Sequence, residues 1–463
     1  MLDIMRVLMC LSQSLENTSL RRLCRIVEAL LSVTGRVTMQ GLSRWSERGG
    51  SYRTIQRFFT TSIDWAQLHW LLIREHLLGE ETECLLGGDE VVVTKSGKHT
   101  SGLGRFFSSL YGKPVPGLCF LSLSLISVKR RCSYPLRLEP IVEAATEGNS
   151  QAKPKGKAKG KAKGKAKGAR KANQKASRSN PPKPQGRPKG STNRNRRAVD
   201  LSPYLVFVQG IIRQVLTLLG QRLKVRYFVF DGAFGHNHAL QMVRQTGLEL
   251  ISKLRHNAAL YQPFEGEYRG RGPRKKYGAK LDYRQLPVEH LKENSVDGAI
   301  RTLIYQLPVW HKLFPDQLNV VIIVKIHQHT QVQKHIVLFS SDLTLGYQQL
   351  IDYYRLRFQL EFNFRDAKQH WGLEDFMSVK PTPVYNSANL SMFMVTLSQV
   401  LMRPLREGCP GFSVNDLKAL FRGRKYVLET IKCLPEMPEP IIIDQIISQV
   451  AQLGRVNQEL ESA

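Results

Sequence analysis

The sequence predicts an α/β fold in which helices flank a mixed sheet, with helical regions at both ends of the chain. Three observations support this prediction. Apolar residues recur at helical spacing in the first 80 residues, short apolar runs alternate with helical patterns between 200 and 254, and helical spacing returns after 346. The length of 463 residues exceeds one ordinary core and favours about three structural units.

The range 1–80 is expected to form a helical domain. Apolar residues of 23–31 build one stripe, and 38–48 fits a second short helix. Two glycines then break the chain, and Ser51 is expected to cap a third helix. The pattern of that third helix places Tyr52, Ile55, Phe58 and Phe59 inward and leaves Arg53, Thr54 and Arg57 on the open face.

This order of a helix, a glycine turn and a basic helix suits two roles. Side chains such as Arg53 and Arg57 could contact base edges and phosphates in the major groove of DNA. A small helical bundle with a solvated basic face would have the same pattern. The sequence alone leaves both interpretations open.

The region 81–145 changes to strand patterns, and the region 146–199 follows as a basic tract. Residues 151–197 hold 18 Lys and Arg and no acidic residue. Such a composition cannot bury enough apolar surface to fold, so we expect a disordered linker or arm. The end of the tract, 184–189, is close to an AT-hook, with Arg187 in its Gly-Arg-Pro core, but Gln185 stands where that pattern usually has arginine. Non-specific phosphate binding by the tract is the favoured interpretation.

The charge of the chain points to a polyanionic partner. Without the tract, the remaining residues still carry +12 of the formal net charge of +30. Nucleic acid is the natural partner, because each neutralised phosphate releases condensed counterions. No run approaches the roughly 18 apolar residues of a membrane-spanning helix, and the first residues lack the basic start of a secretory signal. Seven cysteines without ligand-like pairs fit a reducing cytosol. We therefore expect a cytoplasmic protein with no membrane partner.

Helices and strands alternate in the region 200–254. The pattern predicts a helix at 205–223, a strand at 227–230, a helix at 238–246 and a strand at 248–254. The region 255–345 is β-rich, with strand-like runs at 299–305, 320–326 and 336–340. Helical patterns dominate from 346 to the C-terminus.

Two carboxylate positions stand out beside predicted strands. Asp231 directly follows the apolar strand at 227–230, and Gly232 lets the chain turn away, so this carboxylate is exposed at the sheet edge. Asp89 and Glu90 precede a run of valines that reads as another strand. Because successive strand residues point to opposite faces, only one of these two acids can share a site with Asp231.

The range 348–369 is predicted to be one helix. At about 100° per residue, Tyr354, Arg357, Glu361, Arg365 and Lys368 project from one narrow face. Ion pairs between residues four apart would explain a solvated stripe. The cations outnumber the single carboxylate, however, and this excess favours an external anion.

The spacing Tyr354-x2-Arg357-x3-Glu361-x6-Lys368 matches the Y-x2-R-x3-E-x6-K signature in full. In this motif, and in the order of elements from Asp89 to Lys368, the chain resembles bacterial insertion-sequence DDE transposases of the YREK group. That resemblance implies an RNase H-like core, with a β-rich insertion between the second acid and the catalytic helix. It also implies a bacterial, nucleoid-associated location. A long basic tract between the first two acids departs from the family pattern.

The resemblance assigns catalytic and metal-binding roles to Asp89, Asp231 and Glu361. Asp89 is chosen over Glu90 because the resembling proteins have an Asp ahead of a β-branched run and a basic, glycine-containing loop. Hard divalent cations prefer oxygen ligands, and two ions about 3.5–4 Å apart can hold the attacking and leaving oxygens of a phosphoryl displacement. We expect two Mg²⁺ ions, which Mn²⁺ can replace, and water or a 3′-OH as nucleophile.

The DNA contacts expected from the resemblance begin with Tyr354, Arg357 and Lys368, which would orient phosphates near the cut. The further residues assigned to DNA binding are Arg365, Arg255, Arg53, Arg57, Lys98 and Arg187. Arg255 also suits a structural salt bridge. His236 and His238 could bind a metal, but a loop or helix-start role is favoured. Trp310 could stack on an unpaired or flipped base, although core packing is the commoner role of tryptophan.

The implied function is transposition: binding the terminal inverted repeats of an insertion sequence, cutting there and transferring the 3′-OH ends to target DNA. Pairing of two ends implies a homodimer in the synaptic complex. A catalytically silent DNA-binding regulator and a stand-alone endonuclease remain alternatives, and charge alone does not exclude RNA. The expected organisation is a helical DNA-binding domain (1–80), two parts of the core (81–145 and 200–254), the basic tract (146–199), the β-rich insertion (255–345), the catalytic helix with the end of the core (346–405) and a C-terminal helical region (406–463).

Overall fold

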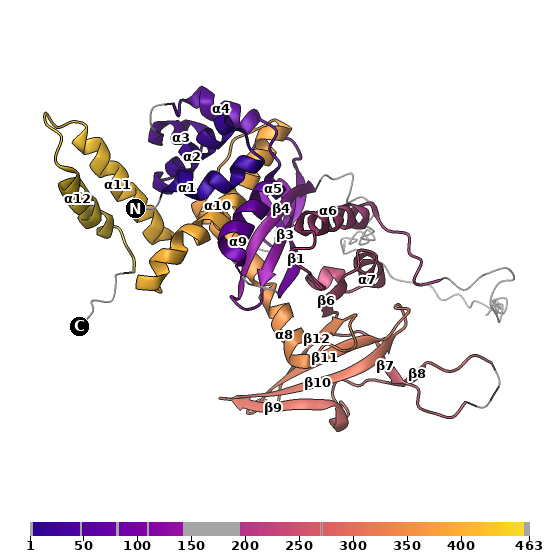
Figure 1. Ribbon diagram of the computed structural model, residues 1–463. Helices are drawn as coiled ribbons and strands as arrows, with labels where there is room; N and C mark the ends of the chain where they lie inside the picture. The colour runs from indigo at the N-terminus through magenta and orange to yellow at the C-terminus, as the bar shows by residue number, and fades with distance from the viewer. Residues whose placement is uncertain are drawn as a thin grey trace, which may run out of the picture.

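The computed structural model describes residues 3–46, 49–79, 83–108, 111–141, 195–268, 270 and 272–457. Most of the predicted basic tract, including Arg187 and the AT-hook-like segment, lies outside the described residues. Figure 1 shows a body of helices around a central sheet, a second β-rich body below it and a helical hairpin that projects to one side. The predicted fold class, a mixed α/β core with an inserted β-rich part and helical regions, is confirmed.

Helices fill the first 80 residues, as predicted. They are α1 (Ile4–Leu8), η1 (Met9–Gln13), α2 (Asn17–Ser32), α3 (Met39–Trp45), α4 (Tyr52–Thr60), α5 (Trp65–Ile73) and the π-helical turn η2 (Arg74–Leu78). Ser51 caps α4 by accepting a hydrogen bond from the backbone amide of Thr54 at 3.4 Å. Ile55, Phe58 and Phe59 are buried, as expected.

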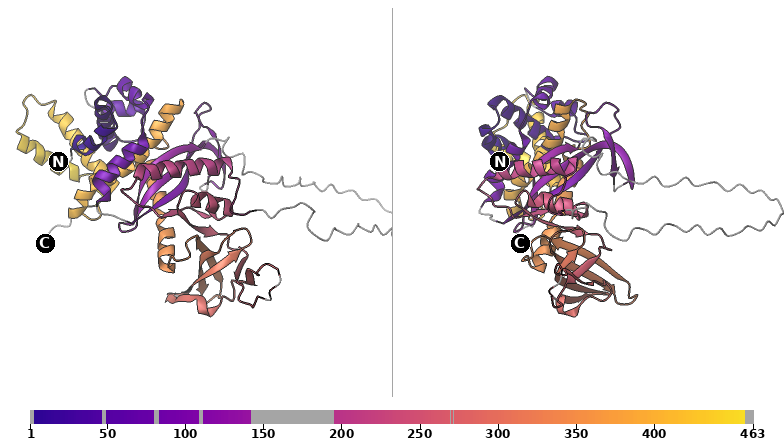
Figure 2. Two further views of the ribbon diagram at one scale, coloured as in Figure 1. Left: turned by 45° about the vertical axis from the view of Figure 1, so that its right-hand side comes forward. Right: turned by 90° about the vertical axis from the view of Figure 1, so that its right-hand side faces the viewer.

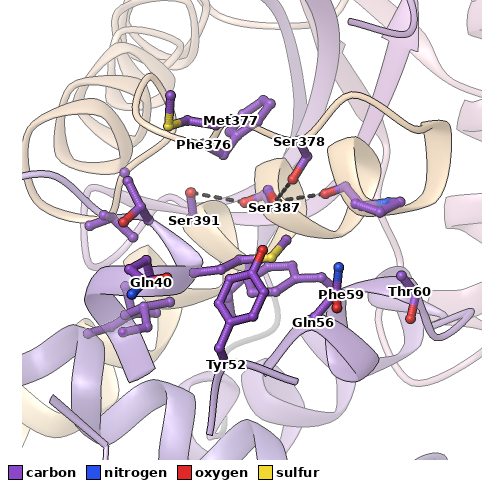
Figure 3. A pocket seen from close by; sticks show the side chains of 18 of the residues that line it. Gln40, Tyr52, Gln56, Phe59, Thr60, Phe376, Met377, Ser378, Ser387 and Ser391 are labelled. Atoms are coloured by element: carbon purple, nitrogen blue, oxygen red, sulfur yellow. Dashed lines mark hydrogen bonds between the residues drawn. The ribbon is translucent and has the colours of Figure 1, made fainter. Parts of the chain in front are cut away.

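Tyr52 is 43% exposed, so the prediction that it faces inward is wrong. It is the first residue of α4, and its side chain faces an open groove rather than packed neighbours. Its ring lines this groove of about 440 Å³, which lies between α3, α4 and the segment that follows α9 (Gln359–His370) (Figure 3). Phe59, Phe376 and Met377 line the same groove.

The core sheet has the strand order β4-β3-β1-β5-β6. Its strands are β1 (Cys84–Thr94), β3 (Lys113–Ser127), β4 (Cys132–Ile141), β5 (Tyr227–Val229) and β6 (Glu249–Leu254), with β2 (Gly104–Ser108) paired to the far end of β3. Strands β4, β3 and β1 are antiparallel neighbours, whereas β1, β5 and β6 are parallel. Parallel neighbours need crossovers, and α6 (Pro203–Leu219) and α7 (Asn237–Arg244) lie in these connections.

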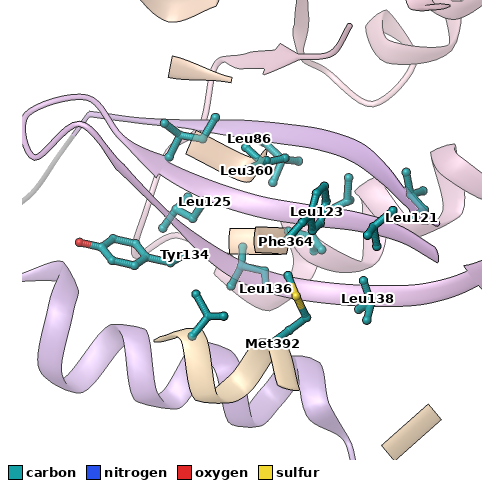
Figure 4. Close-up of a cluster of buried hydrophobic side chains, with 14 of the residues drawn as sticks. Leu86, Leu121, Leu123, Leu125, Tyr134, Leu136, Leu138, Leu360, Phe364 and Met392 are labelled. Carbon is teal, nitrogen blue, oxygen red and sulfur yellow. The ribbon is translucent and has the colours of Figure 1, made fainter. Parts of the chain in front are cut away.

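Leucine side chains of the core strands pack against the C-terminal helices. Figure 4 shows Leu86, Leu123 and Leu136 of three neighbouring strands against Leu360 of α9 (Gln359–His370) and Met392 of α10 (Pro381–Gly408). All five are fully buried, at 0% exposed, and burial of one such side chain is worth about 1.5–3 kcal/mol. This packing fixes α9 over β1, and thereby fixes where the side chains of α9 lie relative to the strand ends.

The insertion forms a sheet that is continuous with the core. Its strands are β7 (Leu260–Pro263), β8 (Tyr277–Lys280), β9 (Leu291–Asp297), β10 (Ile300–His311), β11 (Leu318–His327) and β12 (Gln333–Ser340). Strand β12 pairs with β6 in antiparallel register, from Val337 opposite Leu254 to Ser340 opposite Ile251. The two bodies seen in Figures 1 and 2 are therefore joined through one hydrogen-bonded ladder.

The helix predicted at 348–369 is two helices, α8 (Tyr347–Leu356) and α9, so this prediction is wrong in its geometry. Between them the backbone amides of Arg357, Phe358 and Leu360 bond to carbonyls three residues earlier, at 3.0–3.3 Å. These bonds tighten the chain into a 3₁₀-like turn. A single helical wheel therefore does not relate Tyr354 to the residues of α9.

The C-terminal region is a helical hairpin. Helix α11 (Val414–Ile431) packs on α2 and α10, and α12 (Pro440–Gln452) packs on α11. Figures 1 and 2 show this hairpin extending away from the sheet. Within the described ranges, none of the helices combines the length and the apolarity needed to cross a bilayer.

Candidate active site

Asp89 and Asp231 lie on neighbouring parallel strands. The β1–β5 ladder pairs Leu86 with Phe228 and Gly87 with Val229, and continuing this register places Asp89 beside Asp231. Strand β5 ends at Val229, one residue earlier than predicted, and Asp231 follows two residues later. Its Oδ1 accepts a hydrogen bond from the backbone amide of Ala233 at 2.9 Å. That bond starts the 3₁₀ turn η4 (Gly232–Phe234) and orients the carboxylate.

Two glycines directly before Asp89 leave room for side chains of neighbouring elements. A Cβ atom at Gly87 would lie 2.6 Å from Cδ1 of Ile126, and one at Gly88 would lie 2.7 Å from Cδ2 of Phe230. Real Cβ atoms essentially never make contacts this short, so a larger residue at either position would force these side chains to shift. The Gly87-Gly88 pair therefore allows close packing of side chains over β1 next to Asp89.

Arg357 connects the first and third predicted acids. Its Nη1 donates to Oδ2 of Asp89 at 2.6 Å, and its Nη2 donates to Oε1 of Glu361 at 2.9 Å. The arginine side chain is only 14% exposed, and its buried Nε has no hydrogen-bond partner. The turn between α8 and α9 places Arg357 at the end of one helix, where its side chain reaches both carboxylates.

The three predicted acids interact electrostatically. Burial raises the pKa of Asp89 to about 6, the guanidinium of Arg357 opposes this rise, and the negative charges of Asp231 and Glu361 add to it. Asp231 and Glu361 thus lie close enough to Asp89 to disfavour its ionised form. The structure brings the three residues into one electrostatic neighbourhood, and the guanidinium of Arg357 pairs with two of them, Asp89 and Glu361.

A divalent cation suits this neighbourhood in its chemistry. Carboxylate oxygens are the ligands that Mg²⁺ prefers, and Arg357 already shows that a cation is bound between Asp89 and Glu361. Among the described residues, however, no three acidic, histidine or cysteine side chains are grouped tightly enough to form a ready metal centre. The position between two of the acids is held by the guanidinium.

Glu90 makes contacts of its own, and burial together with the nearby charge of Asp231 raises its pKa. The hydroxyl of Tyr204, on α6, donates to Oε1 of Glu90, and the thiol of Cys119 lies 3.9 Å from Oε2. Among the ion pairs of the described residues, Arg357 pairs with Asp89 and not with Glu90. The choice of Asp89 over Glu90 stays a prediction. The contact with Tyr204 was missed from the sequence, because no spacing pattern relates a residue of α6 to a residue 114 positions earlier.

The comparison with known families agrees with this arrangement. The sequence matches the family described as DDE superfamily endonuclease over residues 10–305. The chain belongs to this family. No curated protein gives a significant match. The matched range includes Asp89 and Asp231 but ends before α9, so this match does not test the role of Glu361 or membership of the YREK group.

In this DDE superfamily endonuclease, the other motif residues contact protein groups. Nζ of Lys368 donates to the carbonyl oxygen of Val92 at 2.9 Å and pairs with Glu374 at 3.0 Å. Burial raises the pKa of the Tyr354 hydroxyl, and the nearby guanidinium of Arg357 opposes this rise. Tyr354 and Arg357 thus lie near the acids, whereas Lys368 contacts β1 at Val92 and the segment after α9 at Glu374.

Arg365 does not join these residues. Its guanidinium is 54% exposed, pairs with Asp366 at 3.3 Å and lies 4.7 Å from the ring centre of Phe362. The helical pattern of the sequence predicts that Arg365 lies on the same narrow face as Glu361. Because its guanidinium is exposed on α9, Arg365 can contact DNA only outside the group formed by Arg357 and the acids.

The remaining cations that the sequence analysis assigned to DNA are dispersed over the endonuclease. Arg53 and Arg57 are exposed on α4, and Lys98 is exposed in the loop between β1 and β2. Arg255 is exposed at the end of β6 and, in the described part of the chain, makes no salt bridge. The structure thus gives no support to the salt-bridge interpretation of Arg255.

Lys95, which sequence reasoning did not single out, ties the end of β1 to the segment after α9. Its Nζ donates to the carbonyl oxygens of Glu374 and Phe376 at 3.0 and 2.9 Å and lies 3.6 Å from the ring centre of Phe376. The basic loop at 94–99 can be recognised in the sequence, but the sequence does not indicate that Lys95 contacts the segment after α9.

His236 starts a helix, as favoured from the sequence. Its Nδ1 accepts a hydrogen bond from the backbone amide of Ala239 at 3.3 Å and so caps α7. Trp310 lies half-buried on β10, with the ring of Tyr277 edge-on at 6.1 Å and Nζ of Lys276 5.2 Å from its ring centre. A base that stacks on Trp310 would have to compete with this ammonium group.

Proposed function

We propose that this DDE superfamily endonuclease is a transposase that cuts DNA at the ends of a mobile element and joins the freed 3′-OH ends to target DNA. The observation that carries the proposal is that Asp89 and Glu361 share the guanidinium of Arg357, while Asp231 follows the parallel strand next to that of Asp89. Carboxylates gathered in this way favour additional positive charge.

Asp89, Asp231 and Glu361 would hold the divalent ions. Bound Mg²⁺ would neutralise phosphate charge and lower the pKa of an attacking water or hydroxyl. Arg357 has the planar donor geometry that binds carboxylates and phosphates alike, so a scissile phosphate can compete with the acids for its guanidinium. Lys368, beside β1, and Tyr354 would orient the same strand of DNA.

The other parts of the chain would bind and pair DNA ends. We assign recognition of the element ends to residues 1–80, with Arg53 and Arg57 on the exposed face of α4. Dimerisation in the synaptic complex falls to the C-terminal region 406–463, whose hairpin projects from the body (Figure 1). Arg255 and Lys98 would contact phosphates near the acids.

An assay of DNA cleavage and joining tests this function. Purified protein is incubated with labelled DNA that carries the sequences flanking its own gene, with Mg²⁺ or Mn²⁺. We expect cleavage at the terminal repeats and joined products with target DNA. Glu361→Gln should lower both by at least about 100-fold, because losing even a group that only supports a metal ligand costs 10–100-fold.

The matched control is Asp366→Asn, which changes an acid on the same helix that pairs with Arg365 away from the group of acids. It should retain activity within a few-fold. Equal activity of Glu361→Gln and the wild type would contradict the assigned site. Cleavage without any joining, even with pre-cut 3′-OH ends, would identify a stand-alone endonuclease instead.

A further inference from the structure

A hairpin at the edge of the insertion carries a row of cations that lie over aromatic rings. Strands β7 and β8 form this hairpin, and β8 is the last strand of the sheet, at the end opposite to β2 and β3 (Figure 1). The segment 260–280 contains six Lys and Arg and two Glu. This basic, aromatic segment has no part in the group of acids around Arg357.

Each of the described cations at the tip has an aromatic partner. The distances from charged group to ring centre are 5.3 Å for Arg274 over Tyr268, 4.6 Å for Lys275 over Phe264 and 5.2 Å for Lys276 over Trp310. Lys312, just after β10, adds a fourth pair at 4.9 Å over Tyr261. A cation–π contact at an exposed site contributes about 0.5–1 kcal/mol.

These cations are exposed and, within the described residues, make no ion pair with a carboxylate. Unpaired basic groups held in fixed positions attract an external polyanion. Because each of these side chains is already ordered against a ring, it loses less conformational entropy when it binds a phosphate. The surface thus presents phosphate-binding groups that are already arranged.

The end of the basic tract lies beside this hairpin. Nη1 of Arg196 donates to the hydroxyl of Tyr277 at 3.4 Å, and Arg197 pairs with Asp316 at 2.6 Å. Tyr277 is the first residue of β8 and packs edge-on against Tyr261 and Trp310. Arg196 and Arg197, at the described end of the basic tract, therefore lie at the same edge of the insertion as the four cation–aromatic pairs.

We propose that this edge of the insertion, formed by the β7–β8 hairpin and Lys312, binds the phosphate backbone of duplex DNA outside the candidate active site. The arrangement favours phosphates over unpaired bases, because a lysine or arginine already lies over each ring. A stacking base would have to displace that cation, whereas a phosphate contacts it directly. The contact is independent of DNA sequence.

The first test measures binding to a duplex of arbitrary sequence by fluorescence anisotropy, in EDTA, over a range of salt concentrations. The triple variant Arg274→Gln, Lys275→Gln, Lys276→Gln should weaken binding about 10-fold or more and reduce the slope of log K against log salt by about 2–3, since each lost phosphate contact removes about 0.9. Without metal no cleavage occurs, so the result does not depend on the proposed transposase activity.

The matched control removes the same charge from the same insertion through Lys292→Gln, Lys325→Gln, Lys334→Gln, three exposed lysines of β9, β11 and β12. It should change the slope by less than 1. If both triple variants lost the same affinity for duplex DNA, the effect would come from net charge alone, and the proposal would be wrong. A loss restricted to single-stranded DNA would overturn it in favour of base stacking.

A second measurement locates the contact in the full chain, where the basic tract also binds DNA. Duplex DNA should protect Lys275, Lys276 and Lys312 from chemical acetylation by at least about 5-fold, whereas Lys325 and Lys334 remain reactive. Mass spectrometry of the modified peptides gives these rates. Unchanged acetylation of the three hairpin-edge lysines at saturating DNA would contradict the proposal.

Discussion

Replacing Asp231 with asparagine is expected to abolish metal-dependent DNA cleavage while the fold remains intact. Asparagine keeps a side-chain oxygen that can accept the hydrogen bond from Ala233, so η4 retains its cap. The substitution removes the negative charge, and a neutral amide is a much poorer partner for a divalent cation. We expect a loss of at least about 100-fold in the rate of cleavage.

The control for this substitution is Asp282→Asn. Oδ1 of Asp282 accepts a hydrogen bond from the backbone amide of Arg284 at 2.9 Å, which is the same local role in a turn of the insertion. Both variants should show the unfolding temperature of the wild type. If Asp231→Asn cleaved DNA at the rate of Asp282→Asn, Asp231 would have only a structural role.

Replacing Arg357 with alanine is expected to destabilise the protein in the absence of divalent ions. The change leaves Asp89, whose side chain is 19% exposed, without its cation and beside two other acids. Breaking a fully buried ion pair costs about 3–5 kcal/mol, and the partial exposure of these groups lowers the expected loss to about 2–3 kcal/mol. Chemical denaturation in EDTA measures it.

Mg²⁺ should reduce the difference in stability between Arg357→Ala and the wild-type protein. In the wild-type protein a divalent ion has to compete with Arg357 for Asp89 and Glu361, whereas in the variant it does not. Mg²⁺ should therefore raise the unfolding temperature of Arg357→Ala more than that of the wild type. Arg365→Ala, on the exposed side of α9, is the control and should change stability by less than about 1 kcal/mol. Equal shifts with Mg²⁺ in all three proteins would contradict competition at the acids.

The fold, and the place of Asp231 after a strand, could be predicted where local patterns carry the information. The apolar strand before Asp231 is predicted at 227–230 and is formed by Tyr227–Val229, because a short buried apolar run bounded by a turn signal is typical of a strand. Ser51 and His236 cap helices, since such residues satisfy the amides that a helix start leaves free. The motif around Glu361 could be recognised because its spacing is fixed along the chain.

Other features depend on contacts between distant segments. The turn between α8 and α9 interrupts a pattern that reads as one helix, and its place is set by packing of Leu360 against the core strands (Figure 4). The bond of Tyr204 to Glu90 and that of Lys368 to Val92 join segments more than 100 residues apart. A single sequence carries no periodic signal for such pairs.

X-ray diffraction from crystals grown with Mn²⁺ and element-end DNA tests the central claim most directly, because anomalous scattering identifies the metal. We expect anomalous density in contact with carboxylate oxygens of Asp89, Asp231 and Glu361, with the guanidinium of Arg357 turned from the acids to a DNA phosphate. Density only at other groups, with Arg357 still between Asp89 and Glu361 in the DNA complex, would contradict the account.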